Sequence, residues 1–179
     1  MSFDRPIHPS KENVRASAAS AQRNRLINRA LALHFMLQLS LAGDADARLK
    51  RRGLGRVHHR VLYFSHFAPG ITVTELLSAL DVQHQNIQRV LRQLVEHGYV
   101  IARQHPNDGR IRQLYSSRKG EKLLEFVGTD QRERINHAYD QVTFRDVKSY
   151  FKVMGAMLDP DRRKWADRLS SLDNPTAAG

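Results

Sequence analysis

The region between residues 72 and 94 limits the possible folds most, because it holds two short helical patterns separated by a turn. Thr72 is followed three residues later by Glu75, the spacing of a capping box, which predicts that a helix begins at Val73. That helix is short, since Asp81-Val82 resembles the turn of a helix-turn-helix and a new apolar stripe follows it. The stripe has the spacing of one helix face and should point inward; its residues are Ile87, Val90, Leu91 and Leu94.

The outward face of the second predicted helix carries amide and guanidinium groups, where a solvated helix would more often mix Glu and Lys. Gln, Asn and Arg side chains form the bidentate hydrogen bonds that read adenine and guanine edges in a DNA major groove. The alternative is an ordinary amphipathic surface helix, and the helix alone does not decide between the two. The candidate base-contacting residues are Gln83, His84, Gln85, Asn86, Gln88, Arg89 and Arg92. Gln93 lies on the flank of the same face and carries the same kind of amide group.

A basic hairpin follows this helix and favours DNA binding. Gly98 stands where a helix C-cap prefers glycine, and two β-prone runs come after it. The runs meet at Asn107-Asp108-Gly109, whose residue types tolerate positive φ, so this tripeptide is the predicted hairpin tip. Helix, turn, helix and hairpin in that order form a winged helix. The candidate wing contacts are Arg103, Asn107, Asp108, Arg110 and Arg112.

At these residues the sequence resembles the MarR family of bacterial transcription regulators, over roughly residues 26–150. The resemblance is carried by Glu75-Leu76-Leu77, by the segment from Leu94 to Arg103, and above all by Asp108-Gly109-Arg110 followed by Ser117-Arg118-Lys119-Gly120. The family's wing has Asp-x-Arg and then Leu-Thr-x-x-Gly. Here Ser116 stands in place of the Leu and Ser117 in place of the Thr. Ser117 can still cap a helix, whereas Ser116 leaves the packing beneath the wing open.

The resemblance implies a homodimeric repressor of transcription that a small ligand releases from double-stranded DNA. Its two recognition helices would enter successive major grooves of a pseudo-palindromic operator, about one helical turn apart. Arg110 would reach a minor groove or flanking phosphates, with Asp108 holding it by an ion pair. The ligand would bind between the dimerisation helices and the DNA-binding lobe, and aromatic carboxylates and acyl thioesters are the compounds to test. Family members also activate transcription, so the sign of regulation stays open.

Both ends of the chain carry apolar helical patterns that a lone winged helix is too small to bury. Residues 30–41 are apolar on nearly every side, and Gly43 is expected to end their helix. Towards the C-terminus a heptad seam is formed by Phe144, Phe151, Leu158, Trp165 and Leu172. Asp159 can cap a helix that restarts at Pro160. The seam could be buried within one chain, but the first helix also needs a partner, so we expect both ends to form a homodimer interface.

The expected fold is mainly α with a small β component (α+β): a winged helix-turn-helix lobe with N- and C-terminal dimerisation helices. The expected division is a loose tail over residues 1–15, a dimerisation helix and connector over 16–54, the DNA-binding domain over 55–117, dimerisation helices over 118–172 and a disordered tail over 173–179. The helix that Ser117 opens is expected to weaken at Gly128, and Thr143 with Asp146 loosely resembles another cap.

A helix predicted over residues 56–67 has a core stripe of Val57, Val61, Phe64 and Ala68. Its other face carries Leu62 and three histidines. Two of these histidines, His59 and His66, lie roughly 10 Å apart at ~1.5 Å per residue, too far to share one metal ion unaided. We therefore expect no metal site. The remaining interpretations are surface histidines or a polar-lined effector pocket, with candidate residues His34, His58, His59, Leu62 and His66.

Composition narrows the function classes further. The formal net charge of +11 favours a polyanionic partner. Five positive charges lie among the nine residues 48–56, which form either a solvated connector or a phosphate-contacting loop. The lack of cysteine excludes disulfides and thiol chemistry. No apolar run reaches the ~18 residues of a membrane span, so we expect a cytoplasmic protein without a membrane partner.

The sequence offers no enzymatic site. It lacks a glycine-rich phosphate loop, a nucleophile elbow and a carboxylate pair in an apolar setting, so we expect neither catalysis nor a cofactor. The main alternative to a ligand-responsive regulator is a constitutive, architectural DNA-binding protein without an effector. Response to a ligand would separate the two.

Overall fold

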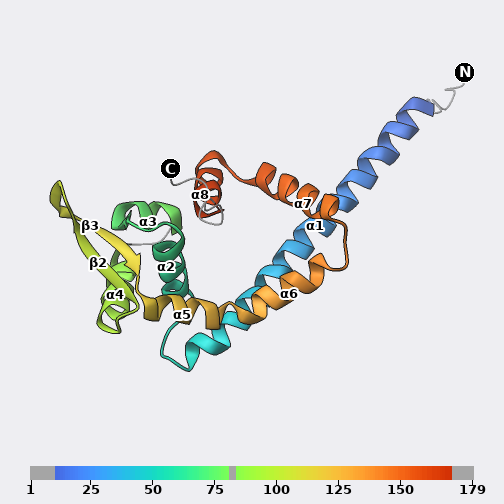
Figure 1. Ribbon diagram of the computed structural model, residues 1–179. Helices are drawn as coiled ribbons and strands as arrows, with labels where there is room; N and C mark the ends of the chain where they lie inside the picture. The colour runs from blue at the N-terminus through green and yellow to red at the C-terminus, as the bar shows by residue number, and fades with distance from the viewer. Residues whose placement is uncertain (1–10, 81–83, 171–179) are drawn as a thin grey trace, which may run out of the picture. The chain divides into compact units, whose positions relative to one another are not determined.

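The computed structural model describes the backbone of residues 11–80 and 84–170 (Figure 1). Side chains are described from residue 19 to 80 and from 85 to 170. The chain forms two compact units, residues 1–42 and 43–179. Helix α1 (Lys11–Lys50) begins in the first unit and ends in the second. Within the described ranges, no helix has an apolar stretch long enough to cross a membrane.

The first unit is the N-terminal part of α1, and its large apolar side chains lie exposed: Leu26, Ile27, Leu31, Leu33, Phe35, Met36, Leu37 and Leu39. The expected end of this helix at Gly43 is wrong, because α1 continues to Lys50. One glycine costs a helix only about 1 kcal/mol relative to alanine, and the strong helix formers around Gly43 offset that. The helix also begins at Lys11, so the predicted loose tail up to residue 15 was too long.

The second unit holds the winged helix and the helices that follow it. Its remaining elements are α2 (Arg56–Phe67), β1 (Ile71–Thr72), α3 (Val73–Leu80), α4 (His84–Glu96), β2 (Val100–His105), β3 (Asp108–Ser116), α5 (Arg118–Val127), α6 (Thr129–Tyr139), α7 (Phe144–Met157) and α8 (Pro160–Ser170). The three strands form an antiparallel sheet in the order β1-β3-β2. This mainly helical architecture with a small sheet confirms the predicted fold class. The expected turn at Asp81-Val82 lies outside the described residues.

A single core joins α2, α3 and α4 to the sheet and to α5. The predicted inward stripe of α4 is confirmed, since Ile87 and Leu94 have no exposed surface and Val90 and Leu91 have little. They pack in one cluster with buried residues from the neighbouring elements: Val61, Leu62, Ile71, Leu76, Val100, Leu114, Leu123, Leu124 and Val127. Burial of this apolar surface is the main source of the lobe's stability.

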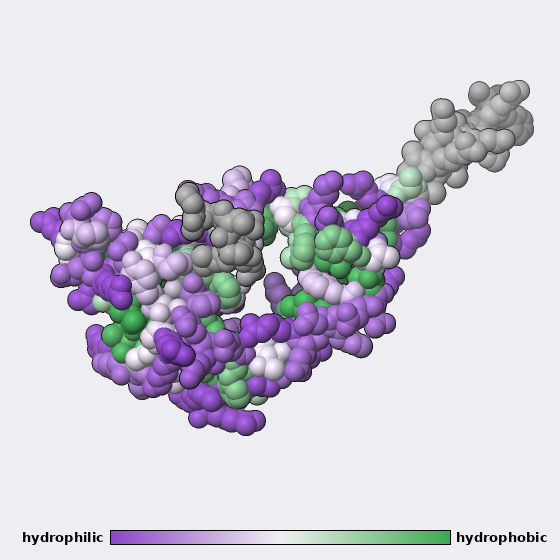
Figure 2. Space-filling model, in the orientation of Figure 1, coloured by the Kyte–Doolittle hydropathy of each residue, from purple (hydrophilic) through white to green (hydrophobic). Residues whose placement is uncertain are grey.

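The hairpin β2–β3 extends from the sheet as a long, twisted ribbon (Figure 1). Regular pairing runs from Val100 opposite Ser116 to Gln104 opposite Arg112, and the register then shifts at His105, which pairs with Asp108. The turn itself is Pro106-Asn107, so the predicted tip was shifted towards β3. Figure 2 shows that the surface of this hairpin is predominantly hydrophilic.

The C-terminal helices are separated by three breaks, each at a position that the sequence indicated. Gly128 ends α5 and starts α6. Thr143 and Asp146 form a full capping box at the start of α7, with the Thr143 hydroxyl donating to the Asp146 carboxylate at 2.6 Å. Asp159 caps α8 by accepting from the backbone N–H of Arg162 at 2.9 Å.

The heptad seam does not form one continuous surface, because the helix break before Pro160 redirects the chain. On α7, Phe144 and Phe151 are 73% and 52% exposed. On α8, by contrast, Trp165 packs edge-to-face on Phe64 of α2, with ring centroids 5.5 Å apart. Trp165 of the seam therefore packs within the chain, whereas we expected a second subunit to cover it. Leu172 lies outside the described residues.

Candidate nucleic-acid interface

The first helix of the helix-turn-helix, α3, is fixed by the predicted capping box. The Glu75 carboxylate accepts from the backbone N–H of Thr72 at 2.8 Å and from its hydroxyl at 2.9 Å, while the Glu75 N–H donates to the Thr72 hydroxyl at 3.2 Å. Burial alone would raise the pKa of Glu75, but the hydrogen bonds from Thr72 and the neighbouring Arg168 lower it overall. Glu75 therefore keeps its negative charge and its capping role at neutral pH.

The second helix, α4, presents its polar face to solvent. Burial of the apolar stripe on one side leaves the other side exposed. The exposed candidates are Gln85, Asn86, Gln88, Arg89 and Arg92. Gln83 lies outside the described residues, as does the side chain of His84, whose backbone begins the helix. Five of the seven candidates are therefore placed on one accessible face.

The hairpin carries all five of its candidate residues in exposed positions: Arg103, Asn107, Asp108, Arg110 and Arg112. The guanidinium of Arg103 lies over the ring of Tyr115, 5.2 Å from its centroid. Asp108 accepts from the backbone N–H of Arg110 at 2.9 Å. Asp108 therefore shapes the turn through the backbone, whereas we expected it to hold the Arg110 guanidinium by an ion pair.

Helix α4 and the hairpin meet at one groove of about 810 Å³. Leu77, Leu91 and Leu114 contribute its apolar lining. Three arginines from the two elements line it as well: Arg92 from α4, and Arg110 and Arg112 from β3. Two candidate recognition residues, Gln88 and Arg92, and two candidate wing residues, Arg110 and Arg112, thus line one concave surface, to which Glu96 contributes a single acidic group. Sequence spacing could not show this convergence, because it depends on how the hairpin folds back towards α4.

A set of polar contacts locks the start of α5 to the turn between α4 and β2. The Ser117 hydroxyl donates to the Gly98 carbonyl at 2.6 Å and also caps α5 by accepting from Gly120 N–H at 3.0 Å. Lys119 donates to the His97 carbonyl at 2.7 Å. Gly98 has a φ of 71°, in the left-handed region that favours glycine. The C-terminal end of α4 is therefore held in place by Ser117, which caps α5, and by Lys119 in the first turn of α5.

The α2 histidines have different surroundings. His66 Nδ1 lies 3.0 Å from the Ser116 hydroxyl, so the serine that departs from the family's wing pattern makes a polar contact at the base of β3. Leu62 is 2% exposed and belongs to the core, so our placement of it on the outer face of α2 is wrong. The reason is that α5 covers that side of α2, where a Cβ on Gly120 would come within 2.9 Å of Leu62. His59 is partly buried, and this burial lowers its pKa, with Asp46 raising it and Arg60 lowering it by smaller amounts.

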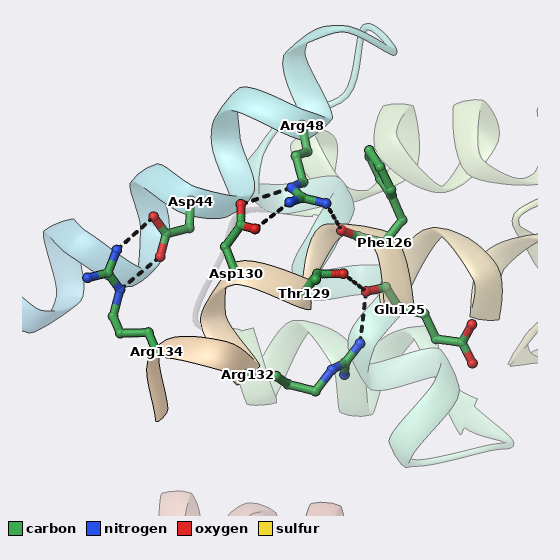
Figure 3. Close-up of polar contacts among 8 residues, drawn as sticks. All are labelled: Asp44, Arg48, Glu125, Phe126, Thr129, Asp130, Arg132 and Arg134. Atoms are coloured by element: carbon green, nitrogen blue, oxygen red, sulfur yellow. Dashed lines mark hydrogen bonds and ion pairs between the residues drawn. The ribbon is translucent and has the colours of Figure 1, made fainter. Parts of the chain in front are cut away.

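Several cations of the basic segment at residues 48–56 are bound within the protein. Arg48 forms a bidentate ion pair with Asp130 of α6 and donates to the Phe126 carbonyl of α5 at 2.8 Å (Figure 3). Arg56 pairs with Asp46 at 2.7 Å. Near this cluster, Arg134 of α6 contacts both carboxylate oxygens of Asp44 (Figure 3). Arg48 and Arg56 therefore form ion pairs within the protein. Neither interpretation of this segment, as a solvated connector or as a phosphate-contacting loop, predicted these ion pairs.

Comparison with known proteins gives four similarities. Residues 52–111 match the MarR family. The chain is 34% identical over 139 residues to the HTH-type transcriptional regulator PetP of Rhodobacter capsulatus, covering 78% of this chain and 84% of that protein. Its fold is similar to the crystal structure of the MarR family transcription regulator SP03579, with a TM-score of 0.64, 22% identity, and coverage of 84% of this chain and 96% of that one. The fold is also similar to that of a mutant of S. aureus MepR bound to an oligodeoxyribonucleotide, with a TM-score of 0.50, 18% identity, and coverage of 72% and 94%.

Proposed function

Because the chain belongs to the MarR family of transcription regulators, we propose that it reads a specific double-stranded DNA sequence through α4 and the β2–β3 hairpin. The family consists of regulators and not enzymes, in agreement with the predicted lack of catalysis. The observation that carries the proposal is the groove in which Arg92, Arg110 and Arg112 converge beside the exposed amide and arginine side chains of α4. Guanidinium and amide groups are the side chains that recognise base edges, and arginines also bind phosphates.

The two elements are proposed to have different roles. Arg89 and Gln85 on the outer face of α4 would contact base edges in the major groove. Arg110, beyond the hairpin turn, would bind phosphates or a narrow minor groove, which supplies affinity but little direct sequence information. This division can be tested because the two kinds of contact respond differently to salt and to sequence.

The test uses a duplex selected from a random pool by the full-length protein, together with a scrambled duplex of equal length. Arg110→Ala should weaken binding to both and lower the salt dependence by about one unit per lost phosphate contact. Arg89→Ala should mainly reduce the preference for the selected duplex, by roughly 1–3 kcal/mol for a lost base contact. Arg145→Ala, on exposed α7, removes the same charge outside the winged helix and is the matched control.

Two outcomes would count against this assignment. If Arg89→Ala and Arg110→Ala both bind like Arg145→Ala, the DNA-binding face lies elsewhere. If the unaltered protein binds all duplexes equally, the alternative of a constitutive architectural protein is favoured. A ligand-responsive repressor and a cytoplasmic location are proposed on the family resemblance, and the effector pocket stays a prediction. A screen of aromatic carboxylates and acyl thioesters against the selected complex would test the repressor proposal.

We also propose a homodimer. Large apolar side chains are exposed along residues 26–39, and soluble proteins rarely leave such continuous apolar surface uncovered. A second copy would bury this surface by twofold symmetry and present a second α4 to the next half-site. Leu31 and Phe35, which are 65% and 63% exposed, lie one turn apart on the same helix face. Replacing both with Glu should lower the mass measured by light scattering from a dimer to a monomer, and an unchanged dimer would place the interface elsewhere.

A further inference from the structure

A polar side chain ties the recognition helix to the connection between α1 and α2. Gln93 lies on the flank of α4, between its buried stripe and its exposed face, and is half-buried. Its Oε1 is 2.8 Å from Nε2 of His58, near the start of α2. Its amide nitrogen donates to the Gly53 carbonyl at 3.4 Å. Both ends of the amide therefore contact residues outside the helix-turn-helix, whereas its position on the helix flank suggested a base-reading residue.

The hydrogen bonds at His58 fit one tautomer of its neutral ring. Nδ1 accepts from the backbone N–H of Gly55 at 3.2 Å, so this nitrogen carries no proton. A neutral imidazole then carries its proton on Nε2, which donates to Oε1 of Gln93. This assignment leaves the Gln93 amide group free to donate to Gly53. With this tautomer, one consistent set of donors and acceptors links Gly55, His58, Gln93 and Gly53 in that order.

The connection that receives these contacts is itself anchored. Leu49 at the end of α1 and Leu54 within the connection are 2% and 5% exposed, and the backbone N–H of Leu54 donates to the Leu49 carbonyl at 3.1 Å. Arg48, which directly precedes Leu49, holds the end of α1 to Asp130 and to the Phe126 carbonyl at the α5–α6 bend. The positions of Gly53 and Gly55 are therefore fixed by the end of α1 and by α5 and α6, which contact it.

We propose that Gln93 is a positioning residue for DNA recognition, which with His58 fixes the rotation of α4 relative to the α1–α2 connection. This inference rests on the proposed function. Gln93 is adjacent to Arg92 and one helical turn after Arg89, so a small rotation of α4 displaces both arginines relative to base edges. Apolar packing alone is non-directional, whereas a hydrogen bond with defined donor and acceptor has a preferred geometry. Through the same contacts, a displacement of the end of α1 would reach the DNA-reading face.

The experiment compares the full-length protein with Gln93→Met, which keeps the length of the side chain but cannot form either hydrogen bond. Gln93→Glu keeps an acceptor for His58 but cannot donate to Gly53. His58→Ala and the His58→Ala/Gln93→Met double variant complete a double-mutant cycle. Gln141→Met, in the exposed loop between α6 and α7, is the matched control. For each protein, the Kd is measured for a duplex selected by the unaltered protein and for a scrambled duplex, together with the thermal midpoint.

Gln93→Met should reduce the preference for the selected duplex roughly three- to tenfold, the range expected for the loss of one or two hydrogen bonds. The preference of Gln93→Glu for the selected duplex should lie between that of Gln93→Met and that of the unaltered protein. The double variant should lose little more of this preference than either single variant, because both changes act through one contact. All measurements are made well below the thermal midpoint of each variant, so that partial unfolding does not contribute.

Three outcomes are distinguishable from this result. A lower midpoint with an unchanged preference for the selected duplex would show that Gln93 only stabilises the fold, and would overturn the inference. An equal loss of affinity for both duplexes would also overturn it, because positioning of base contacts must alter discrimination. If the unaltered protein selects no duplex, the proposed function itself fails, and this is visible before any variant is measured.

Discussion

Gly120→Ala should strongly destabilise the lobe, because the start of α5 approaches Tyr99, the residue before β2, more closely than any side chain permits. A Cβ at Gly120 would lie 2.2 Å from the Tyr99 carbonyl oxygen and 2.9 Å from Cδ1 of Leu62. The backbone would have to separate by about 1 Å to restore an ordinary contact. Relief through Tyr99 is difficult, because its carbonyl also accepts from the backbone N–H of Ser117 at 3.0 Å.

The expected loss can be estimated from these contacts. Overpacking a close contact costs about 1–3 kcal/mol, and the backbone partner places this site at the upper end. Alanine in place of a helical glycine stabilises the helix by at most about 1 kcal/mol. The net loss is therefore about 2 kcal/mol, which for a chain of this size lowers the thermal midpoint by roughly 4–8 °C.

Urea denaturation followed by circular dichroism, at one fixed protein concentration, measures the free energy of unfolding of this variant. Gly43→Ala is the matched control, since Gly43 lies inside α1 and a Cβ there meets nothing within 4 Å. It should stabilise the protein by about 0.5–1 kcal/mol. The reasoning would be refuted if Gly120→Ala were as stable as the unaltered protein, because the approach of α5 to Tyr99 would then be looser than the structure shows.

Two further changes test the packing around α2. Trp165→Ala removes the half-buried indole from Phe64 and should lower the free energy of unfolding by roughly 2 kcal/mol, about half the value for a fully buried aromatic. Unfolding by denaturant measures this loss. An unchanged free energy of unfolding would mean that α8 does not pack on the lobe. Burial lowers the pKa of His59, so the folded state binds a proton less readily than the unfolded state, and the stability present above pH 6.5 should decline as pH falls through the lowered pKa. His59→Gln should flatten that decline in a pH series of denaturation curves, and an equally steep decline in the variant would assign it to other groups.

The helix-turn-helix could be predicted from the sequence because its signals are local. The Thr72–Glu75 capping box and the stripe from Ile87 to Leu94 each lie within one or two helical turns, and both form as expected. The same local reasoning was wrong at Gly43, because a glycine inside a long run of helix formers lowers helix stability without ending the helix. Local patterns therefore predicted where helices form better than where they stop.

The errors in the candidate site come from contacts between distant segments. Leu62 shares a helix with the histidines, and its spacing could not show that α5 covers its side of α2. Trp165 fits the heptad period of α7, yet it packs on Phe64, because spacing does not distinguish a partner in the same chain from one in a second chain. Gln93 looked like a base-reading residue until the positions of His58 and Gly53 were known.

The order of the sheet has a practical consequence for studies of this protein. Strand β2 lies at one end of the order β1-β3-β2, so its outer backbone groups form an open edge to which another chain could add a strand. A charged, exposed side chain such as Arg103 and the register shift at His105 discourage such pairing. Variants that lack the arginines of the β2–β3 hairpin would therefore be expected to aggregate more readily when they are not bound to DNA. Substitution with Lys or Gln would weaken recognition while keeping the edge polar, and is the safer choice for such variants.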